Sequence, residues 1–381
     1  MITAPKRNPH RLRFGAVVVL GASVVVAGCS GGSPTPSSSS STGTTSAPSS
    51  VSATVIPPGT GTATGTSSYV VLGDSYSAGV GAGGSTDSCY RSQRGYAPLV
   101  AAHYGLQLSY QACSGAMTQD VLTNQLGTLG AGTSRVSMTI GGNDVGFAFV
   151  LFTCGAPSWL SDCTGAIARG RTTLQTKLPG RLKSLFAQIR GRAPRAKVTI
   201  VGYPHLFGTR DCDALTFFSG PDRTDLNKAV DQLDALLTTT ATSYGFDFVD
   251  PRSQFTGHTP CAAAPWINGL SFPVGDSYHP NFPGQQAYAS LVGPALNATS
   301  SARAPQVTAT ATQPSVQAVA GAVLSMKLDQ PAQLKAAQQA GVPTADLKRY
   351  LQQLRSEDTA QQAAGLAGLR ALDRAAAARI R

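Results

Sequence analysis

Charged side chains are scarce in this 381-residue chain and make up 13% of it. The longest apolar run, residues 14–27, is shorter than the roughly 20 residues that a helix needs to cross a bilayer. No CxxC pair occurs, which argues against a structural zinc site. The GxSxG elbow of the α/β-hydrolase fold is also missing. The length nevertheless allows a sizeable buried core.

The net charge of +11 is spread unevenly along the chain. Residues 1–13 contribute four positive charges, residues 69–298 a net +2 and residues 299–381 a net +5. Residues 14–68 carry no charge. The central region is therefore nearly neutral and has no basic stripe with interleaved aromatic residues, so we do not expect a nucleic-acid partner.

The N-terminus has a basic stretch, a short apolar run and small residues, which is the pattern of a secretion signal. The run ends in Val26-Ala27-Gly28-Cys29, which resembles the lipobox of bacterial lipoproteins. The resemblance implies that residues 1–28 are a signal peptide and that Cys29 is lipid-modified. The protein would then be anchored on the extracytoplasmic face of the cell membrane, with some release to the medium. The alternative is an ordinary cleaved signal in which Cys29 has no role.

Residues 29–67 consist almost wholly of Ser, Thr, Pro, Gly and Ala. Such a stretch cannot bury enough apolar surface to offset its ordering entropy, so we interpret it as a tether. From residue 68 to 298, apolar runs alternate with helical patterns, which predicts an α/β domain with a parallel sheet covered on both faces. The expected strands are Tyr69–Leu72, Leu106–Gln111, Val136–Ile140, Val198–Val201 and Phe246–Val249.

Helical spacing is clear at 178–189 and 226–237, and a last helix, Pro283–Leu296, is expected after an Asn281 cap. Residues 299–381 form an Ala/Thr/Pro-rich linker and a small helical extension, with apolar residues at helical spacing at 347–354 and 366–372. This extension is too small to bury much core alone. It either packs on the α/β domain or binds something in the cell envelope, and we assign it no chemistry.

Besides Cys29, the chain has six cysteines. An even number in an exported chain indicates disulfides, and six cysteines allow 15 pairings, among which the sequence does not choose. The six are Cys89, Cys113, Cys154, Cys163, Cys212 and Cys261.

The run Gly73-Asp74-Ser75-Tyr76-Ser77-Ala78-Gly79 follows the first expected strand. A turn of this kind can hold a serine hydroxyl exposed at the start of a helix, so Ser75 is the candidate nucleophile. The alternative is that Ser75 only caps that helix. His279 is the candidate base because Asp276 precedes it by three residues and can orient the ring. By itself His279 could also be an ordinary loop histidine, and His205, at a strand end, is a candidate for lining the site.

Two further strand ends supply candidate donors for an oxyanion, the backbone N–H of Gly115 and the side-chain amide of Asn143. Ligands of open α/β sheets bind just beyond the carboxyl ends of the strands. Glycine and asparagine are also ordinary turn residues, so only their joint placement with Ser75 favours an oxyanion hole.

The blocks GDSYSAG, CSGA, GGND and DSYHP resemble those of the SGNH hydrolases, also called the GDSL family, and most of all its secreted actinobacterial esterases and lipases. The resemblance covers residues 68–298. It implies a three-layer α/β/α, flavodoxin-like fold and ester hydrolysis without metal or cofactor. It also implies a Ser75–His279–Asp276 triad and an oxyanion hole from Ser75, Gly115 and Asn143. Sequential disulfides are implied as well: Cys89–Cys113, Cys154–Cys163 and Cys212–Cys261.

Other functions explain the sequence less well. Gly79–Gly84 matches a GxGxxG dinucleotide pattern but does not directly follow the strand, so we interpret it as slack around an open ester pocket. The rival from another class is a non-catalytic envelope-binding lipoprotein in which the helical extension is the working part. The expected partners of a monomeric enzyme are an ester substrate and, through Cys29, the membrane.

Overall fold

The computed structural model describes residues 67–85, 87–211, 216–296 and 315–380. The expected signal peptide, Cys29 and nearly all of the tether lie outside the described residues. Most of the linker after residue 298 also lies outside them. Among the described residues, no helix combines the length and the apolar character that a membrane crossing requires.

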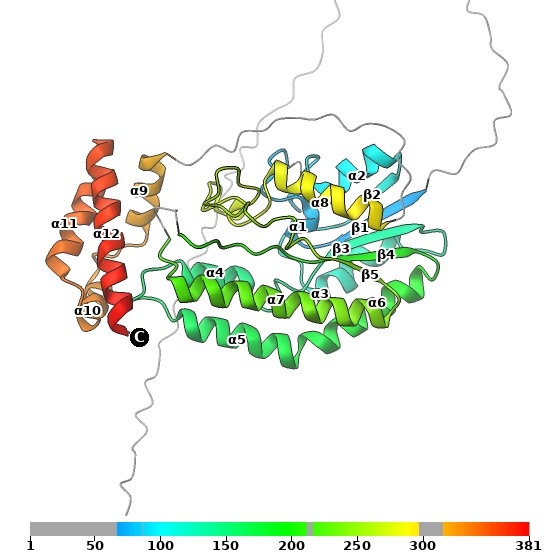
Figure 1. Cartoon of the computed structure of the whole chain (residues 1–381), viewed down its shortest axis with the longest axis horizontal. Coiled ribbons are helices and arrows are strands. Elements are labelled where there is room, and N and C mark those ends of the chain that lie inside the picture. Colours follow the sequence, from blue (N-terminus) through cyan, green and yellow to red (C-terminus); the bar gives the residue numbers. More distant parts are fainter. Residues whose placement is uncertain (1–66, 86, 212–215, 297–314, 381) are drawn as a thin grey trace, which may run out of the picture. The chain divides into compact units, whose positions relative to one another are not determined.

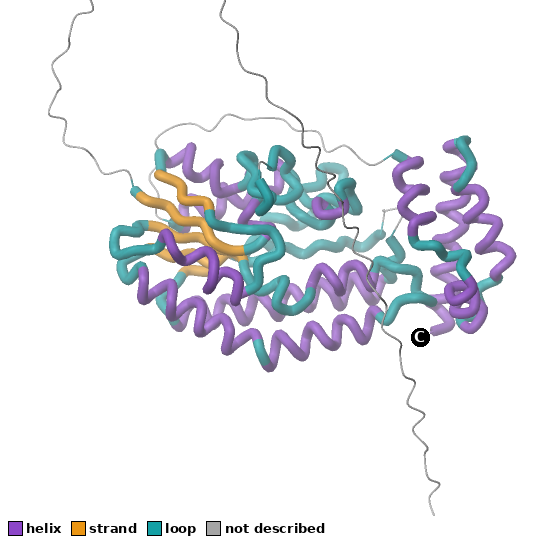
Figure 2. The backbone as a smooth tube through the Cα atoms, turned by 180° about the vertical axis from the view of Figure 1, so that it is seen from behind, coloured by secondary structure: helices purple, strands orange, loops and turns teal. Residues whose placement is uncertain are grey.

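Five parallel strands form the sheet of the described part of the chain, in the order β2-β1-β3-β4-β5 (Figures 1 and 2). All five expected strands are confirmed to within one residue at most ends. Their bounds are Ser68–Gly73 for β1, Gln107–Tyr110 for β2, Arg135–Thr139 for β3, Lys197–Val201 for β4 and Asp247–Val249 for β5. The central strands β1, β3 and β4 are buried along nearly their whole length because helices cover both faces of the sheet.

Helices α2 (Tyr96–Tyr104) and α8 (Phe282–Ala295) pack together over one face of the sheet. Helices α5 (Cys163–Thr176), α6 (Leu178–Arg192) and α7 (Gly220–Ser243) lie along the other face (Figure 1). The fold is therefore the expected three-layer α/β/α arrangement. The shorter elements are α1 Ser75–Ala78, α3 Thr118–Asp120, η1 Val121–Gln125, η2 Leu126–Thr128, α4 Phe147–Cys154 and η3 Val274–Asp276.

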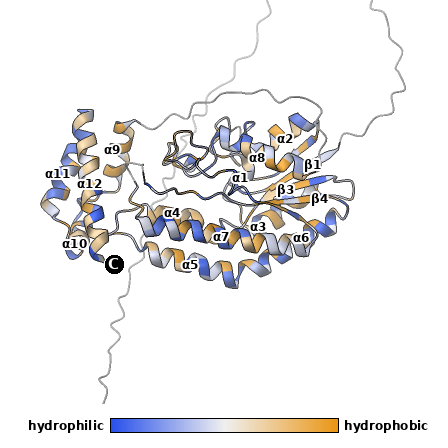
Figure 3. Cartoon of the chain, viewed as in Figure 1, coloured by the Kyte–Doolittle hydropathy of each residue, from blue (hydrophilic) through white to orange (hydrophobic). Residues whose placement is uncertain are grey.

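The helices of the layer formed by α5, α6 and α7 are amphipathic, and Figure 3 shows both hydrophilic and hydrophobic residues along α5 and α7. In α7 the buried side chains include Leu226, Val230, Leu233 and Leu237, a spacing that puts them on one face. Helix α8 begins where the sequence predicted, because the Asn281 side chain accepts a hydrogen bond from the amide of Gly284.

The C-terminal extension forms four helices, α9 (Val316–Ser325), α10 (Pro331–Gln339), α11 (Thr344–Leu354) and α12 (Thr359–Ile380). Two of them, α9 and α10, were not predicted. The buried apolar side chains of the four helices lie in one hydrophobic core. Trp159 and Phe217 of the α/β domain are buried in that same core. The extension therefore packs on the α/β domain.

Disulfides join Cys89 to Cys113 and Cys154 to Cys163, as the family resemblance implied. Cys261 is also disulfide-bonded. Its predicted partner, Cys212, lies outside the described residues.

Candidate active site

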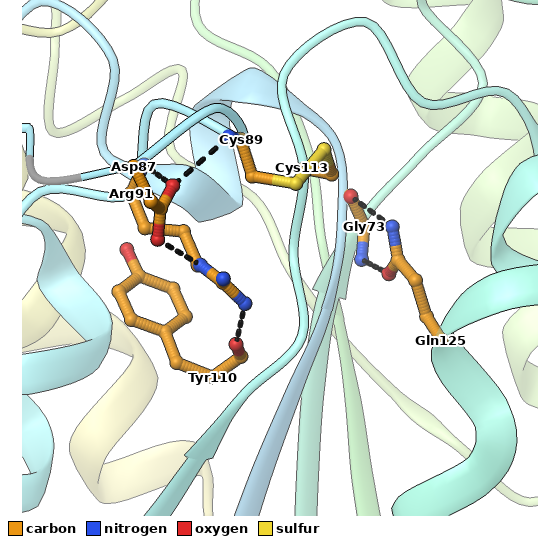
Figure 4. Close-up of a disulfide and its surroundings, with 7 residues drawn as sticks. All are labelled: Gly73, Asp87, Cys89, Arg91, Tyr110, Cys113 and Gln125. Carbon is orange, nitrogen blue, oxygen red and sulfur yellow. Dashed lines mark hydrogen bonds and ion pairs between the residues drawn. A yellow bond between two sulfur atoms is a disulfide. The ribbon is translucent and has the colours of Figure 1, made fainter. Parts of the chain in front are cut away.

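The turn that carries Ser75 begins at Gly73, whose backbone is fixed on both sides by one side chain. The Gln125 amide donates to the Gly73 carbonyl (3.0 Å), and its oxygen accepts from the Gly73 N–H (2.7 Å) (Figure 4). Gly73 has φ +111°, and a Cβ there would lie 2.2 Å from the Thr139 carbonyl oxygen. Only glycine fits where β1 ends this close to β3.

Helix α1 is capped by Asp74, whose side chain accepts a hydrogen bond from the Tyr76 N–H at 3.1 Å. Ser75 is the first residue inside the helix and is not its N-cap. The alternative role of Ser75 as a helix cap is therefore excluded in the structure. Its hydroxyl is left available for other contacts.

Asp74 is nearly completely buried beneath the site. Its carboxylate accepts hydrogen bonds from the Thr139 hydroxyl (2.6 Å) and from the Tyr203 hydroxyl. Burial raises the pKa of Asp74 to about 6, although these hydrogen bonds act to lower it. The carboxylate thus links β1, β3 and the turn after β4 directly below the candidate nucleophile.

The candidate nucleophile and base meet in the structure. The Ser75 Oγ lies 2.7 Å from the Nε2 of His279. Burial lowers the pKa of His279 to about 4, against the opposing effect of hydrogen bonds to the backbone of Ser277 and Gly275. The imidazole is consequently neutral near pH 7, as a general base must be.

The structure differs from the expected triad at its third position. The Nδ1 of His279 lies 3.0 Å from the Ser277 carbonyl oxygen, not beside the Asp276 carboxylate. Asp276 is half-buried, and its carboxylate is hydrogen-bonded to the backbone of Gly81. Burial raises the pKa of Asp276, and this hydrogen bond acts in the opposite direction. The spacing of three residues suggested a contact with the Asp276 side chain. In the structure η3 ends at Asp276, and the carbonyl of the next residue, Ser277, reaches the Nδ1 of His279.

The carbonyl contact fixes the tautomer of His279. A carbonyl oxygen can only accept a hydrogen bond, so Nδ1 carries the proton and Nε2 presents a lone pair to the Ser75 hydroxyl. This is the arrangement in which Nε2 can remove the hydroxyl proton.

The loop of His279 is held by residues from distant parts of the chain. The Tyr76 hydroxyl donates to the Tyr278 carbonyl at 2.7 Å. Asn268 donates its backbone N–H to the His279 carbonyl (2.9 Å) and its side-chain amide to the Gly81 carbonyl (3.0 Å). These contacts anchor the base relative to the nucleophile.

Gly81 is tightly packed and is not the slack that the sequence suggested. It has φ +87°, and a Cβ there would lie 2.8 Å from the Cβ of His279. Glycine at this position therefore allows the backbone to approach the loop of His279 closely.

The two expected oxyanion donors also line the pocket that holds Ser75. Gly115 has φ +82°, and a Cβ there would meet no atom within 4 Å, so its backbone faces open space. One N–H of the Asn143 amide is directed to the Ala116 carbonyl at 3.1 Å. An amide group has two N–H donors, so the second remains for a ligand.

Asp144, the neighbour of Asn143, holds the turn after β3. Its side chain is almost fully buried and accepts hydrogen bonds from the Thr118 hydroxyl (2.7 Å), the Thr118 N–H (2.8 Å) and Arg181 (2.9 Å). Truncating this carboxylate would leave the Thr118 donors and Arg181 without their partner, which explains why an acid follows the asparagine.

A cavity of about 820 Å³ contains Ser75, His279, Gly115 and Asn143. Most of its remaining lining is apolar, and α4 contributes Phe147, Ala148, Val150, Leu151 and Phe152. Helix α4 faces the cavity and carries Cys154, which belongs to the Cys154–Cys163 disulfide, at its end.

The other expected site histidine, His205, does not belong to this cavity. Its Nε2 lies 2.7 Å from the Asp231 carboxylate, and it lines a separate hollow. Among the described residues, no group of three or more His, Cys, Asp or Glu side chains has the arrangement of a metal site.

Sequence reasoning missed several residues that position the site: Asp74, Thr139, Tyr203, Asn268 and Gln125. Of these residues, only Asp74 stands inside one of the four blocks, GDSYSAG, so that block was the available signal. Thr139 and Gln125 stand outside them, and only the packing of β3 and η1 against β1 reveals their role.

Residues 71–287 match the family model described as the GDSL-like Lipase/Acylhydrolase family. The chain is 43% identical over 221 residues to a lipase of Streptomyces rimosus, which covers 57% of this chain and 82% of that protein. It is 44% identical over 224 residues to Lipase 1 of Streptomyces coelicolor, with 57% and 82% covered.

Two solved structures share the fold. The extracellular lipase of Streptomyces rimosus is 42% identical, with a TM-score of 0.57, and 61% of this chain covers 100% of it. Phospholipase A1 of Streptomyces albidoflavus is 38% identical, also with a TM-score of 0.57, and 61% of this chain covers 99% of it.

Proposed function

The chain belongs to the GDSL-like Lipase/Acylhydrolase family and is a carboxylic ester hydrolase, and from its site we propose a lipase or esterase in which Ser75 is the nucleophile and His279 the general base. The distance of 2.7 Å between the Ser75 Oγ and the His279 Nε2 is the observation that carries this proposal. Their position in one cavity with Gly115 and Asn143 supports it.

In the proposed mechanism, Ser75 attacks the ester carbonyl while its proton moves to the Nε2 of His279. The imidazolium then protonates the leaving alcohol. In the second step His279 takes a proton from water as the water attacks the acyl-enzyme, and it returns that proton to the Ser75 oxygen when the acid leaves. The Ser277 carbonyl accepts a hydrogen bond from Nδ1–H throughout and stabilises the imidazolium by its dipole, where a triad would use a carboxylate.

Three donors would stabilise the negative charge that develops on the carbonyl oxygen of the ester by hydrogen bonds. They are the N–H groups of Ser75 and Gly115 and the second N–H of the Asn143 amide. The first N–H of α1 lacks an intrahelical acceptor, as in any helix, which suits it to this role. The Ala116 carbonyl holds the Asn143 amide before substrate arrives, so little reorganisation is needed.

Hydrolysis of p-nitrophenyl esters by the purified protein tests the proposal, with Ser75→Ala as the matched variant. Equal release of p-nitrophenol by both proteins would contradict the assignment of Ser75 as the nucleophile.

We predict that Asp276→Asn lowers kcat less than about tenfold. The Ser277 carbonyl, and not this carboxylate, faces the Nδ1 of His279, and the neutral amide can still accept the hydrogen bond from Gly81. Loss of a true triad carboxylate costs on the order of 10⁴ in kcat. Steady-state kinetics of the variant distinguish the two, and a loss near 10⁴ would restore Asp276 to the triad.

We further propose that the enzyme is attached to the outer face of the cell membrane through a lipid on Cys29. The support is the sequence alone: small residues before a single cysteine at the end of the apolar run. Cys29→Ala is expected to move the protein from the membrane fraction to the medium, as measured by fractionation and immunoblotting. A variant that stays with the membrane as wild type does would contradict the anchor.

A further inference from the structure

Residues of the C-terminal extension line the same cavity as Ser75. They come from the end of α9 and from the segment that leads into α10. The residues are Ala322, Ser325, Met326, Leu328 and Gln333. The cavity is therefore built from two parts of the sequence: the α/β domain supplies the reacting groups, and the extension supplies lining far from them in sequence.

Buried contacts hold the extension in place against two segments of the α/β domain. The Asp373 carboxylate of α12 accepts the Ser158 N–H at 2.5 Å, and burial raises the pKa of Asp373. Trp159 and Phe217 are buried in the core of the four helices. The neighbours of these contact residues in the sequence line the cavity: Pro157, Leu160, Thr216 and Phe218. The two segments that hold the extension therefore also form part of the cavity wall.

The chemistry of the cavity suits an apolar chain. Across from the catalytic groups it is lined by Phe and Leu side chains of α4 and by Ala322, Met326 and Leu328 of the extension. Apart from Asp74, which its own hydrogen bonds occupy, and His279, Arg171 is the one Asp, Glu, Lys, Arg or His side chain along the described lining. A volume of about 820 Å³ lies within the range of roughly 300–1,000 Å³ in which pockets enclose ligands of moderate size.

The extension lies beyond the region that the family model matches. The family model ends at residue 287, before α9, and the Streptomyces rimosus structure is covered completely by 61% of this chain. About two fifths of this chain, including the described helices beyond the matched region, therefore adds to the shared fold.

We propose that α9 and the segment leading into α10 form the distal wall of the acyl pocket and make the enzyme selective for esters of long acyl chains. The inference rests on the proposed esterase function. Each methylene that the wall removes from water favours binding about fourfold, so contact with a few distal carbons is enough to set the chain-length preference.

The test is Ala322→Trp, which fills the distal part of the cavity. Its matched control is Ala345→Trp, the same substitution at an exposed position of α11 that does not line the cavity. The readout is the ratio of kcat/KM for p-nitrophenyl palmitate to that for p-nitrophenyl butyrate. We expect Ala322→Trp to lower this ratio at least tenfold and Ala345→Trp to leave it within twofold of wild type. A second variant, Met326→Glu, places a charge in the wall and should lower the ratio in the same direction.

A binding measurement separates this inference from the proposed catalysis. Titration of the full-length Ser75→Ala protein with a fluorescent C16 fatty acid should give an affinity that Ala322→Trp weakens at least tenfold. Thermal unfolding identifies a variant that has failed to fold, in which case Met326→Glu provides the result. If folded Ala322→Trp hydrolyses esters with the wild-type chain-length ratio, or binds the fatty acid with the wild-type affinity, the proposed role of the extension in the acyl pocket is wrong. A wild-type protein that binds the fatty acid through this wall but hydrolyses no ester overturns the proposed function alone.

Discussion

Ser75→Ala is expected to lower kcat for ester hydrolysis by about 10⁶, close to the limit of detection. The Ser75 hydroxyl lies 2.7 Å from the His279 Nε2, and without this hydroxyl no acyl-enzyme can form. Any residual hydrolysis would come from the oxyanion donors and from substrate binding, which remain in the variant. Burst kinetics and steady-state rates with p-nitrophenyl butyrate measure the loss.

Ser184→Ala is the matched control for this substitution. Ser184 is exposed on α6, and among the described residues its hydroxyl is hydrogen-bonded only to the Gly180 carbonyl of the same helix. It should keep wild-type kcat, and both variants should unfold at the wild-type temperature. A Ser75→Ala protein that retains more than about 1% of the wild-type rate would mean that another residue is the nucleophile.

His279→Ala is expected to lower kcat by a similar factor, about 10⁶, because base and nucleophile act as a unit and their losses are not additive. The double variant with Ser75→Ala should therefore be no slower than either single variant. His103→Ala, on α2 and outside the cavity, is the control and should remain active. A double variant much slower than both single variants would contradict the pairing.

The same histidine sets the acid limb of the pH profile. Because burial lowers the pKa of His279 to about 4, the neutral base is present above that pH and is lost by protonation below it. The kcat/KM of the wild type should accordingly be half-maximal near pH 4 and not near 6.5, the ordinary value for histidine. A limb near pH 6.5 would contradict this prediction.

Much of the site could be predicted from the sequence because short blocks follow the ends of apolar runs. In a parallel sheet the carboxyl ends of neighbouring strands share one edge, so Ser75, Gly115 and Asn143 had to lie near one another once β1, β2 and β3 were recognised. The strands themselves were readable since burial on both faces leaves continuous apolar runs.

The partner of the His279 ring could not be predicted in this way. Asp276 and Ser277 are adjacent in the sequence, and which of them reaches Nδ1 depends on the backbone angles between η3 and His279. A spacing rule cannot resolve two atoms that differ by one peptide unit. The same limit applies to Gly81, where the approach of the His279 loop, and not the glycine run itself, decides the role.

The sequence alone indicated the family of the chain, its parallel α/β fold, the candidate nucleophile and base, and the pattern of an export signal at its start, since each of these is encoded in local runs of residues. The tertiary structure alone decided how the histidine is oriented and that the helices after residue 315 line the cavity of Ser75. Amphipathic spacing shows that a helix has a buried face, as at Leu347, Leu351 and Leu354. It does not show what covers that face or which cavity the neighbouring turn closes, because both depend on contacts between segments far apart in the chain.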